Sequence, residues 1–238
     1  MRLPLLAALM LTLGGCISTA PAPSGLPVPP PSTVAPVQAG RAAAETFISV
    51  VQRVEPVAED YCRARSAARN CDFRIVVDDR RGQPPNAFQT IDRTGRPVIG
   101  FTLALIADAR NADELAFVLG HEAAHHIAGH IPKRNDQALS GALLAGVLAQ
   151  ASGLSPEEVR AAQNMGAEVA ARSYSKEFEL EADALGAEIA FVAGYDPIRG
   201  SGFFDRLPDP GDKFLGSHPP NAARKALVAA TVRRLGGS

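Results

Sequence analysis

His121-Glu122-Ala123-Ala124-His125 is the stretch that decides the fold and the chemistry predicted for this sequence. It is an H-E-x-x-H motif, and it lies in a segment, residues 111–131, that we predict to be one helix. Residues four apart lie on one face of a helix, so both imidazoles can reach the same metal ion. Glu122 lies close enough to take a proton from a metal-bound water as it attacks a carbonyl. The motif therefore predicts a metal-dependent hydrolase with Glu122 as its general base.

The helix that carries this motif is apolar on every side, which predicts that it is buried. Between Leu115 and Ile131 its polar side chains are Glu122 and four histidines. Uncompensated Glu and His side chains are costly in an apolar setting, so a metal ion is their natural partner. His126 and His130 form a second pair four residues apart, but no carboxylate lies between them. We expect these two to be core or rim histidines that hydrogen-bond to the backbone.

A catalytic zinc usually has three protein ligands, so a third ligand should lie elsewhere in the chain. The predicted helix 176–192 offers one, because Glu179 and Asp183 lie together between two apolar stripes of its helical wheel. We predict that Glu179 is the third ligand and that Asp183 orients a zinc-bound histidine through its free N–H. The alternative is an acidic face that merely winds round the helix. The remaining acids are expected to form a solvated face: Glu177, Glu181 and Glu188.

The two motifs together resemble a known family. His121-Glu-Ala-Ala-His125 and Ser175-Lys-Glu-Phe-Glu-Leu-Glu-Ala-Asp183 are similar to the zinc metallopeptidases that include the CaaX prenyl endopeptidases and HtpX. The similarity is greatest to the soluble periplasmic lipoprotein branch, typified by BepA and LoiP. It implies one zinc ion per chain and the same ligands, base and supporting aspartate that the helical wheel indicates. The family's arginine is Lys176 here, which leaves the ligands unchanged.

Two further segments extend the resemblance. Asn86-Ala-Phe is similar to the tripeptide before the family's substrate-aligning edge strand, which implies substrate binding by Asn86 and an edge strand near 97–102. Ser-His218-Pro-Pro, followed by Arg224, is similar to the family's His-Pro segment. The resemblance implies that His218 can approach the zinc as a fourth ligand and hold the enzyme latent, or help to hold the oxyanion. It also implies that Arg224 contributes to substrate binding. The alternative for His218 is a plain loop histidine.

The sequence predicts an α+β, mainly helical fold: a gluzincin-type metalloprotease core with an H-E-x-x-H helix and a small β-sheet. The proline and glycine of the second predicted strand suit a sheet edge. Polar or proline-rich breaks are expected at 83–86, 133–136 and 208–220. The expected helices are 42–66, 111–131, 137–156, 157–173, 176–192, a short one within 196–205, and 221–235, and the expected strands are 73–77 and 97–102.

Residues 137–156 contain no charge and are long enough to raise the question of a membrane span. Their alanines and glycines contribute little apolar area, however. We therefore expect a buried or membrane-surface helix rather than a span.

The N-terminus predicts export and a lipid anchor. Met1-Arg2 precede a short apolar run and Gly14-Gly15-Cys16, so residues 1–15 are expected to be a signal peptide. Leu-x-Gly-Cys resembles the lipobox of bacterial lipoproteins, which implies lipidation of Cys16; the alternative is an ordinary signal peptide that carries a cysteine. Residues 16–40 would then be the lipidated cysteine and a Pro/Ala-rich linker, and 41–238 the metalloprotease domain. Ile17 favours outer-membrane sorting, so we expect a lipid-anchored periplasmic protein.

The remaining cysteines and the charge balance restrict the function further. In an oxidising periplasm Cys62 and Cys71 are expected to form a disulfide, with two buried thiols as the alternative. Lys and Arg number 24 against 25 Asp and Glu, which excludes the basic footprint of a nucleic-acid-binding protein.

The sequence thus predicts a zinc-dependent endopeptidase of the cell envelope. The resemblance implies unfolded or misassembled envelope proteins as substrates, bound as an added β-strand, and the outer-membrane assembly machinery as a candidate partner. Two alternatives stay open. One is an envelope quality-control chaperone or scaffold with little proteolysis, and the other is a non-enzymatic metal-binding lipoprotein.

Overall fold

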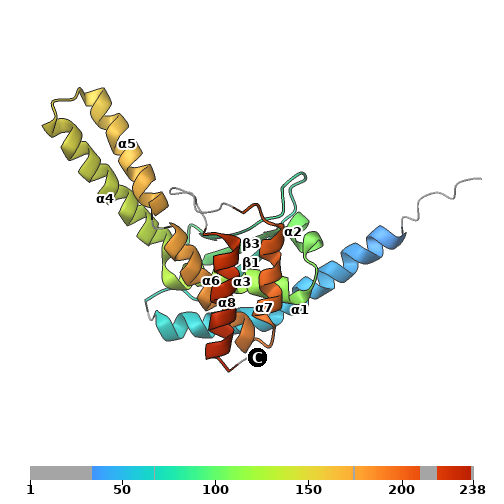
Figure 1. Ribbon diagram of the computed structural model, residues 1–238. Helices are drawn as coiled ribbons and strands as arrows, with labels where there is room; N and C mark the ends of the chain where they lie inside the picture. The colour runs from blue at the N-terminus through green and yellow to red at the C-terminus, as the bar shows by residue number, and fades with distance from the viewer. Residues whose placement is uncertain (1–33, 67, 174, 210–218, 237–238) are drawn as a thin grey trace, which may run out of the picture.

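The computed structural model describes residues 34–236, except 67, 174 and 210–218. It has the mainly helical α+β fold that the sequence predicts (Figure 1). The elements are, in chain order, α1 (Val34–Arg65), β1 (Arg74–Asp78), β2 (Ala87–Ile91), β3 (Pro97–Thr102), α2 (Leu103–Asp108), α3 (Ala112–Ala128), α4 (His130–Ala151), α5 (Pro156–Ser173), α6 (Ser175–Val192), α7 (Pro197–Gly200), the 3-10 helix η1 (Ser201–Arg206) and α8 (Asn221–Arg234).

Helix α3 is the centre of the fold, and it packs against α1, α6 and α7 (Figure 1). Asn111 caps its N-terminus as predicted, with its side chain accepting a hydrogen bond from the Glu114 N–H at 3.0 Å. The prediction of one helix over 111–131 is wrong at the C-terminal end, because α3 ends at Ala128. The chain turns at Gly129, whose φ of 72° is left-handed, and Pro132 follows shortly after. A left-handed glycine with a proline beyond it ends a helix, so His130 belongs to the next helix.

Helices α3 and α6 approach each other so closely that only glycine fits at their contact. A Cβ atom on Gly120 would lie 2.6 Å from the carbonyl oxygen of Gly186, and one on Gly186 would lie 2.6 Å from the backbone nitrogen of His121. The two glycines therefore set the distance at which side chains of α6 meet those of α3.

Replacing Gly120 with alanine is expected to lower the free energy of unfolding by about 1–3 kcal/mol, because the added methyl group overpacks a backbone contact. Denaturant titration of the purified chain measures this change. Gly40→Ala in α1 is the matched control, because nothing lies within 4 Å of its Cβ position. Alanine favours a helix by about 1 kcal/mol over glycine, so this variant should be neutral or stabilised. Equal stabilities of the two variants would contradict the close-approach argument.

The sheet differs from the prediction in its number of strands and in the place of the strand 97–102. The order is β1-β3-β2, with β1 parallel and β2 antiparallel to β3, so the strand expected at an edge is the buried central one. Pro97 is tolerated because it is the first residue of β3. At Gly100 the ring of Phe88 lies where a Cβ atom would be, so a larger residue there would displace this ring. Strand β2 is the edge strand on the side of β3 opposite β1, and it was not predicted because it carries polar residues.

Helices α4 and α5 form a hairpin that projects from the body of the molecule (Figure 1). The polar segment 133–136, expected as a break, lies inside α4. Large apolar side chains along α4 are exposed, among them Leu143, Leu144 and Val147, so the expectation that 137–156 is buried is wrong. Within the described residues, no helix has both the length and the apolar content needed to cross a membrane. Contact of residues 137–156 with a membrane surface stays a prediction.

The predicted disulfide between Cys62 and Cys71 is present, with a Cα–Cα distance of 5.7 Å. It joins the end of α1 to the segment that enters β1. Helix α1 begins at Val34, within the segment 16–40 that was expected to be a linker. Residues 1–15 and Cys16 lie outside the described residues, so the signal peptide and the lipid anchor stay predictions.

Candidate metal centre and active site

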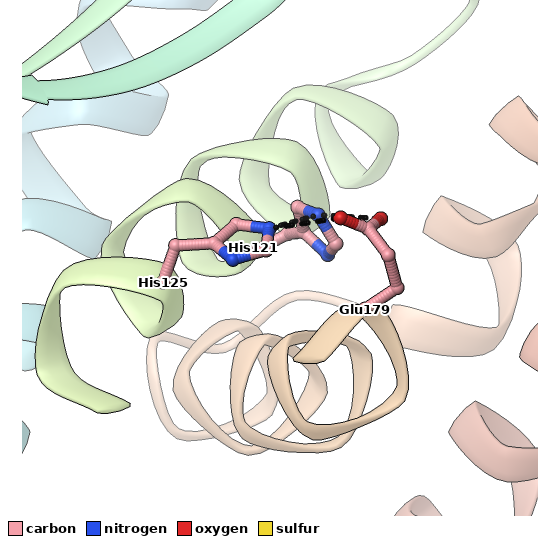
Figure 2. A group of neighbouring side chains, drawn as sticks. All are labelled: His121, His125 and Glu179. Atoms are coloured by element: carbon pink, nitrogen blue, oxygen red, sulfur yellow. Dashed lines mark hydrogen bonds and ion pairs between the residues drawn. The ribbon is translucent and has the colours of Figure 1, made fainter. Parts of the chain in front are cut away.

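Three side chains converge between α3 and α6, as predicted. His121 and His125 project from α3, and Glu179 faces them from the first turns of α6 (Figure 2). The Nε2 atoms of the two histidines are 3.0 Å apart. The Glu179 carboxylate lies 3.6 Å from His121 Nε2 through Oε2 and 3.4 Å from His125 Nε2 through Oε1.

This triangle of donor atoms fits a tetrahedral zinc ion. Ligand atoms about 2.0–2.1 Å from zinc would lie about 3.3 Å from one another, close to the three separations observed. Two imidazoles and one carboxylate are also the donor set of a catalytic zinc with an open fourth position. The two Nε2 atoms face each other, and a shared cation would stabilise their lone pairs. The residues present therefore fit a zinc ion held by His121, His125 and Glu179.

Asp183 contacts the ring nitrogen of His121 that does not face Glu179. It is fully buried, and its Oδ1 atom lies 2.9 Å from His121 Nδ1. The distance is that of a hydrogen bond, although the ring N–H is not aimed straight at the oxygen. Burial opposes the charge on Asp183, but the contacts with His121 and Arg224 outweigh it and lower the pKa of the carboxyl. Asp183 is thus placed to keep a proton on His121 Nδ1 and to leave Nε2 for a metal ion, and this orienting role stays a prediction.

Arg224 is the second partner of Asp183. Its Nε and Nη2 atoms lie 2.6 and 2.7 Å from the two carboxylate oxygens, and Nη2 lies 3.2 Å from Glu179 Oε2. The guanidinium also stacks over the ring of Phe204. Only 4% of Arg224 is exposed. Arg224 therefore binds both Asp183 and Glu179. Contact between Arg224 and a substrate stays a prediction.

Glu122 lies in the same cleft as the ligands. Burial raises the pKa of its carboxyl, and the neighbouring Glu179 adds to this effect, while His121, His125 and Arg224 oppose it. A carboxyl group with a raised pKa is suited to exchange a proton near neutral pH.

The two histidines expected to bind the backbone have different roles. His126 is buried, and its Nε2 atom lies 2.8 Å from the carbonyl oxygen of Asn70, as expected. His130 does not follow the expectation, because its partners are the side chains of His125 and Glu181. Burial lowers the pKa of His130 to about 4, although the bond to Glu181 opposes this shift. The sequence signal for its position was Gly129, which turns His130 back towards the site.

The ligands line a cleft of about 640 Å³ that also contains residues of β2. Asn86 lies on its rim, where its backbone N–H donates to Thr102 Oγ1 at 3.0 Å; substrate binding by Asn86 stays a prediction. His218 lies outside the described residues, so its approach to the metal also stays a prediction.

Comparisons with known proteins agree with this site. The model of Peptidase family M48 matches residues 47–231, which include His121, Glu122, His125 and Glu179. The mitochondrial metalloendopeptidase OMA1 of Arabidopsis thaliana is 31% identical over 136 residues. These residues are 56% of this chain but 27% of that protein, so the match spans little more than a quarter of the relative's length. Membership of the periplasmic lipoprotein branch stays a prediction. The chain belongs to peptidase family M48.

Proposed function

We propose that this protein is a zinc-dependent endopeptidase that hydrolyses peptide bonds of unfolded or misassembled proteins of the bacterial cell envelope. The observation that carries the proposal is the meeting of His121, His125 and Glu179 within 3.0–3.6 Å of one another, with Glu122 in the same cleft. Membership of a peptidase family and the similarity to a mitochondrial metalloendopeptidase support the reaction class.

The chain's own residues divide the work of hydrolysis. His121, His125 and Glu179 would hold a zinc ion, which would supply Lewis-acid polarisation of the scissile carbonyl and lower the pKa of water towards neutrality. Glu122 takes a proton from the attacking water and passes it to the leaving amine. The buried Asp183 and Arg224 keep the ligands in place, so that little reorganisation is needed during the reaction.

The free edge of the sheet is the feature that favours a peptide as the substrate. Among the described residues β2 pairs with β3 alone, so its other edge is available to an extended chain. Ala87, Gln89 and Thr90 of this strand line the cleft that holds His121 and Glu122. A substrate that adds to β2 as a further strand would pass over the catalytic groups with its backbone recognised and its side chains largely free. Such binding selects unfolded segments rather than a particular sequence.

The cellular setting of the proposal rests on the N-terminal sequence. A signal peptide over 1–15 and a lipid on Cys16 would tether the domain in the periplasm, most simply at the outer membrane. The exposed apolar side of α4 would then lie within reach of a membrane or of an assembly partner.

The proposal is tested by cleavage of a permanently unfolded protein, such as reduced and carboxymethylated lactalbumin, beside the same protein in its native form. We expect the full-length chain to cleave the unfolded form alone. Chelation by 1,10-phenanthroline should abolish cleavage, because it removes the ion, and added zinc should restore it. Cleavage that persists after complete metal removal would refute the zinc mechanism.

A His218→Ala variant extends this test to latency. If His218 restrains the wild-type enzyme, the variant should cleave the unfolded substrate faster at equal zinc content. A variant that holds a full complement of zinc and cleaves nothing would instead support the chaperone or scaffold alternative.

A further inference from the structure

We infer that His130 and Glu181 form a second support for the metal centre, a hydrogen-bonded relay that fixes the proton on His125 and directs its Nε2 atom to the metal. The inference rests on the metal centre proposed above and assigns roles to two residues outside its ligand set. His130 acts through His125, and it is therefore a positioning residue.

The relay is continuous and short. His125 Nδ1 lies 2.7 Å from His130 Nδ1, and His130 Nε2 lies 3.0 Å from Glu181 Oε2. His130 is 5% exposed, so water does not compete for its ring nitrogens. Glu181 is half-exposed, which places the acidic end of the relay at the surface.

The proton positions follow from the chemistry of the two ends. If Nε2 of His125 binds a metal, the proton of that ring must lie on Nδ1, which then donates to His130. His130 must accept on Nδ1, so its own proton lies on Nε2. That N–H faces a carboxylate, which is an acceptor when ionised. Every donor therefore meets an acceptor, and one arrangement of protons satisfies the whole relay.

Neighbouring groups hold the relay in place. The His130 ring stacks on Phe178 with centroids 4.5 Å apart and an interplanar angle of 15°, and Phe178 precedes the ligand Glu179 in the chain. Lys133 lies 3.8 Å from Glu181 and opposes its negative charge. The left-handed turn at Gly129 brings His130 back over the end of α3.

The two histidine ligands thus have supports of different kinds. The Nδ1 atom of His121 contacts Asp183, a buried carboxylate that is paired with Arg224. The Nδ1 atom of His125 instead contacts the imidazole of His130, which is hydrogen-bonded to a half-exposed carboxylate. Groups that orient a ligand through its second ring nitrogen usually contribute about 10–100-fold to metal affinity.

The relay is tested by the zinc affinity of the full-length chain, measured by competition with a chelating dye. We expect His130→Leu to bind zinc about 10–100-fold more weakly than wild type, because His125 loses its acceptor. His130→Asn should recover most of the loss, since its amide oxygen lies near the position of the ring Nδ1. Glu181→Gln should weaken binding less than His130→Leu, because its amide oxygen still accepts a hydrogen bond.

His126→Leu is the matched control. His126 is as buried as His130, at 6% exposed, but its bond goes to a backbone carbonyl rather than to a ligand. Both leucine variants should lose stability, and only the one at His130 should lose zinc affinity. A second readout is the imidazole ¹⁵N spectrum of the zinc-loaded chain, in which His130 should be protonated on Nε2 alone.

The outcomes separate the relay from the metal centre. Equal zinc affinities for wild type and His130→Leu, or a proton on Nδ1 of His130, would overturn the relay and leave the centre intact. A wild-type chain that binds no zinc would overturn both.

Discussion

Replacing Glu122 with glutamine is expected to lower the turnover of an unfolded protein substrate by about 10²–10⁴-fold and to leave the zinc content unchanged. Glutamine has nearly the same size and shape, so it fits where Glu122 fits. It cannot accept the proton of the attacking water, however, because its amide is not basic. The rate is measured from the appearance of new amino termini, with zinc determined on the same samples.

Glu177→Gln is the control for the loss of one negative charge. Glu177 is an exposed residue in the first turn of α6, outside the residues that line the cleft. This variant should keep the wild-type rate. A Glu122→Gln protein that cleaves as fast as wild type at equal zinc content would place the general base elsewhere. If both the wild type and the Glu122→Gln protein failed to cleave the substrate, the non-enzymatic metal-binding alternative would be favoured.

Replacing Arg224 with methionine is expected to lower the free energy of unfolding of the metal-free chain by about 3–5 kcal/mol. The substitution leaves Asp183 buried without the cation that binds both its oxygens, and it removes a contact of Glu179 as well. An uncompensated buried charge costs much more than the pair itself contributes. Denaturant unfolding in the presence of a chelator measures the effect without a contribution from bound metal.

Arg233→Met is the control on the same helix, because Arg233 is exposed, and it should change stability by less than about 0.5 kcal/mol. The double variant Asp183→Asn, Arg224→Met should be more stable than the sum of the single changes predicts, because the two residues lose one shared interaction. Arg224→Met unfolding with the wild-type midpoint would contradict the importance assigned to this buried pair.

Local chemistry made most of the metal centre predictable from the sequence. The four-residue spacing of His121 and His125 fixes their common face, and the position of Glu179 and Asp183 between apolar stripes indicated that both point inwards. The capping of α3 by Asn111 and the disulfide were predictable for the same reason, because each depends on residues close in the chain.

Features that depend on residues far apart in the chain were missed. Strand β3 is central because it pairs with β1 on one side and with β2 on the other, and no local sequence pattern contains these pairings. The role of Arg224 depends on α8 packing against α6, which only the fold determines.

The position of His130 was missed for a local reason. The apolar pattern runs through Gly129, although a glycine followed by Pro132 is a recognisable helix end.

The metal content of the purified full-length chain tests the central claim most directly. Elemental analysis should be compared for wild type, His125→Ala and Glu179→Gln after dialysis against limiting zinc. We predict close to one zinc ion per wild-type chain and loss of the ion in both variants, because each removes one of three converging ligands. Zinc retained by Glu179→Gln at wild-type occupancy would contradict the ligand set, and a wild-type chain that takes up no metal would contradict the enzyme mechanism itself.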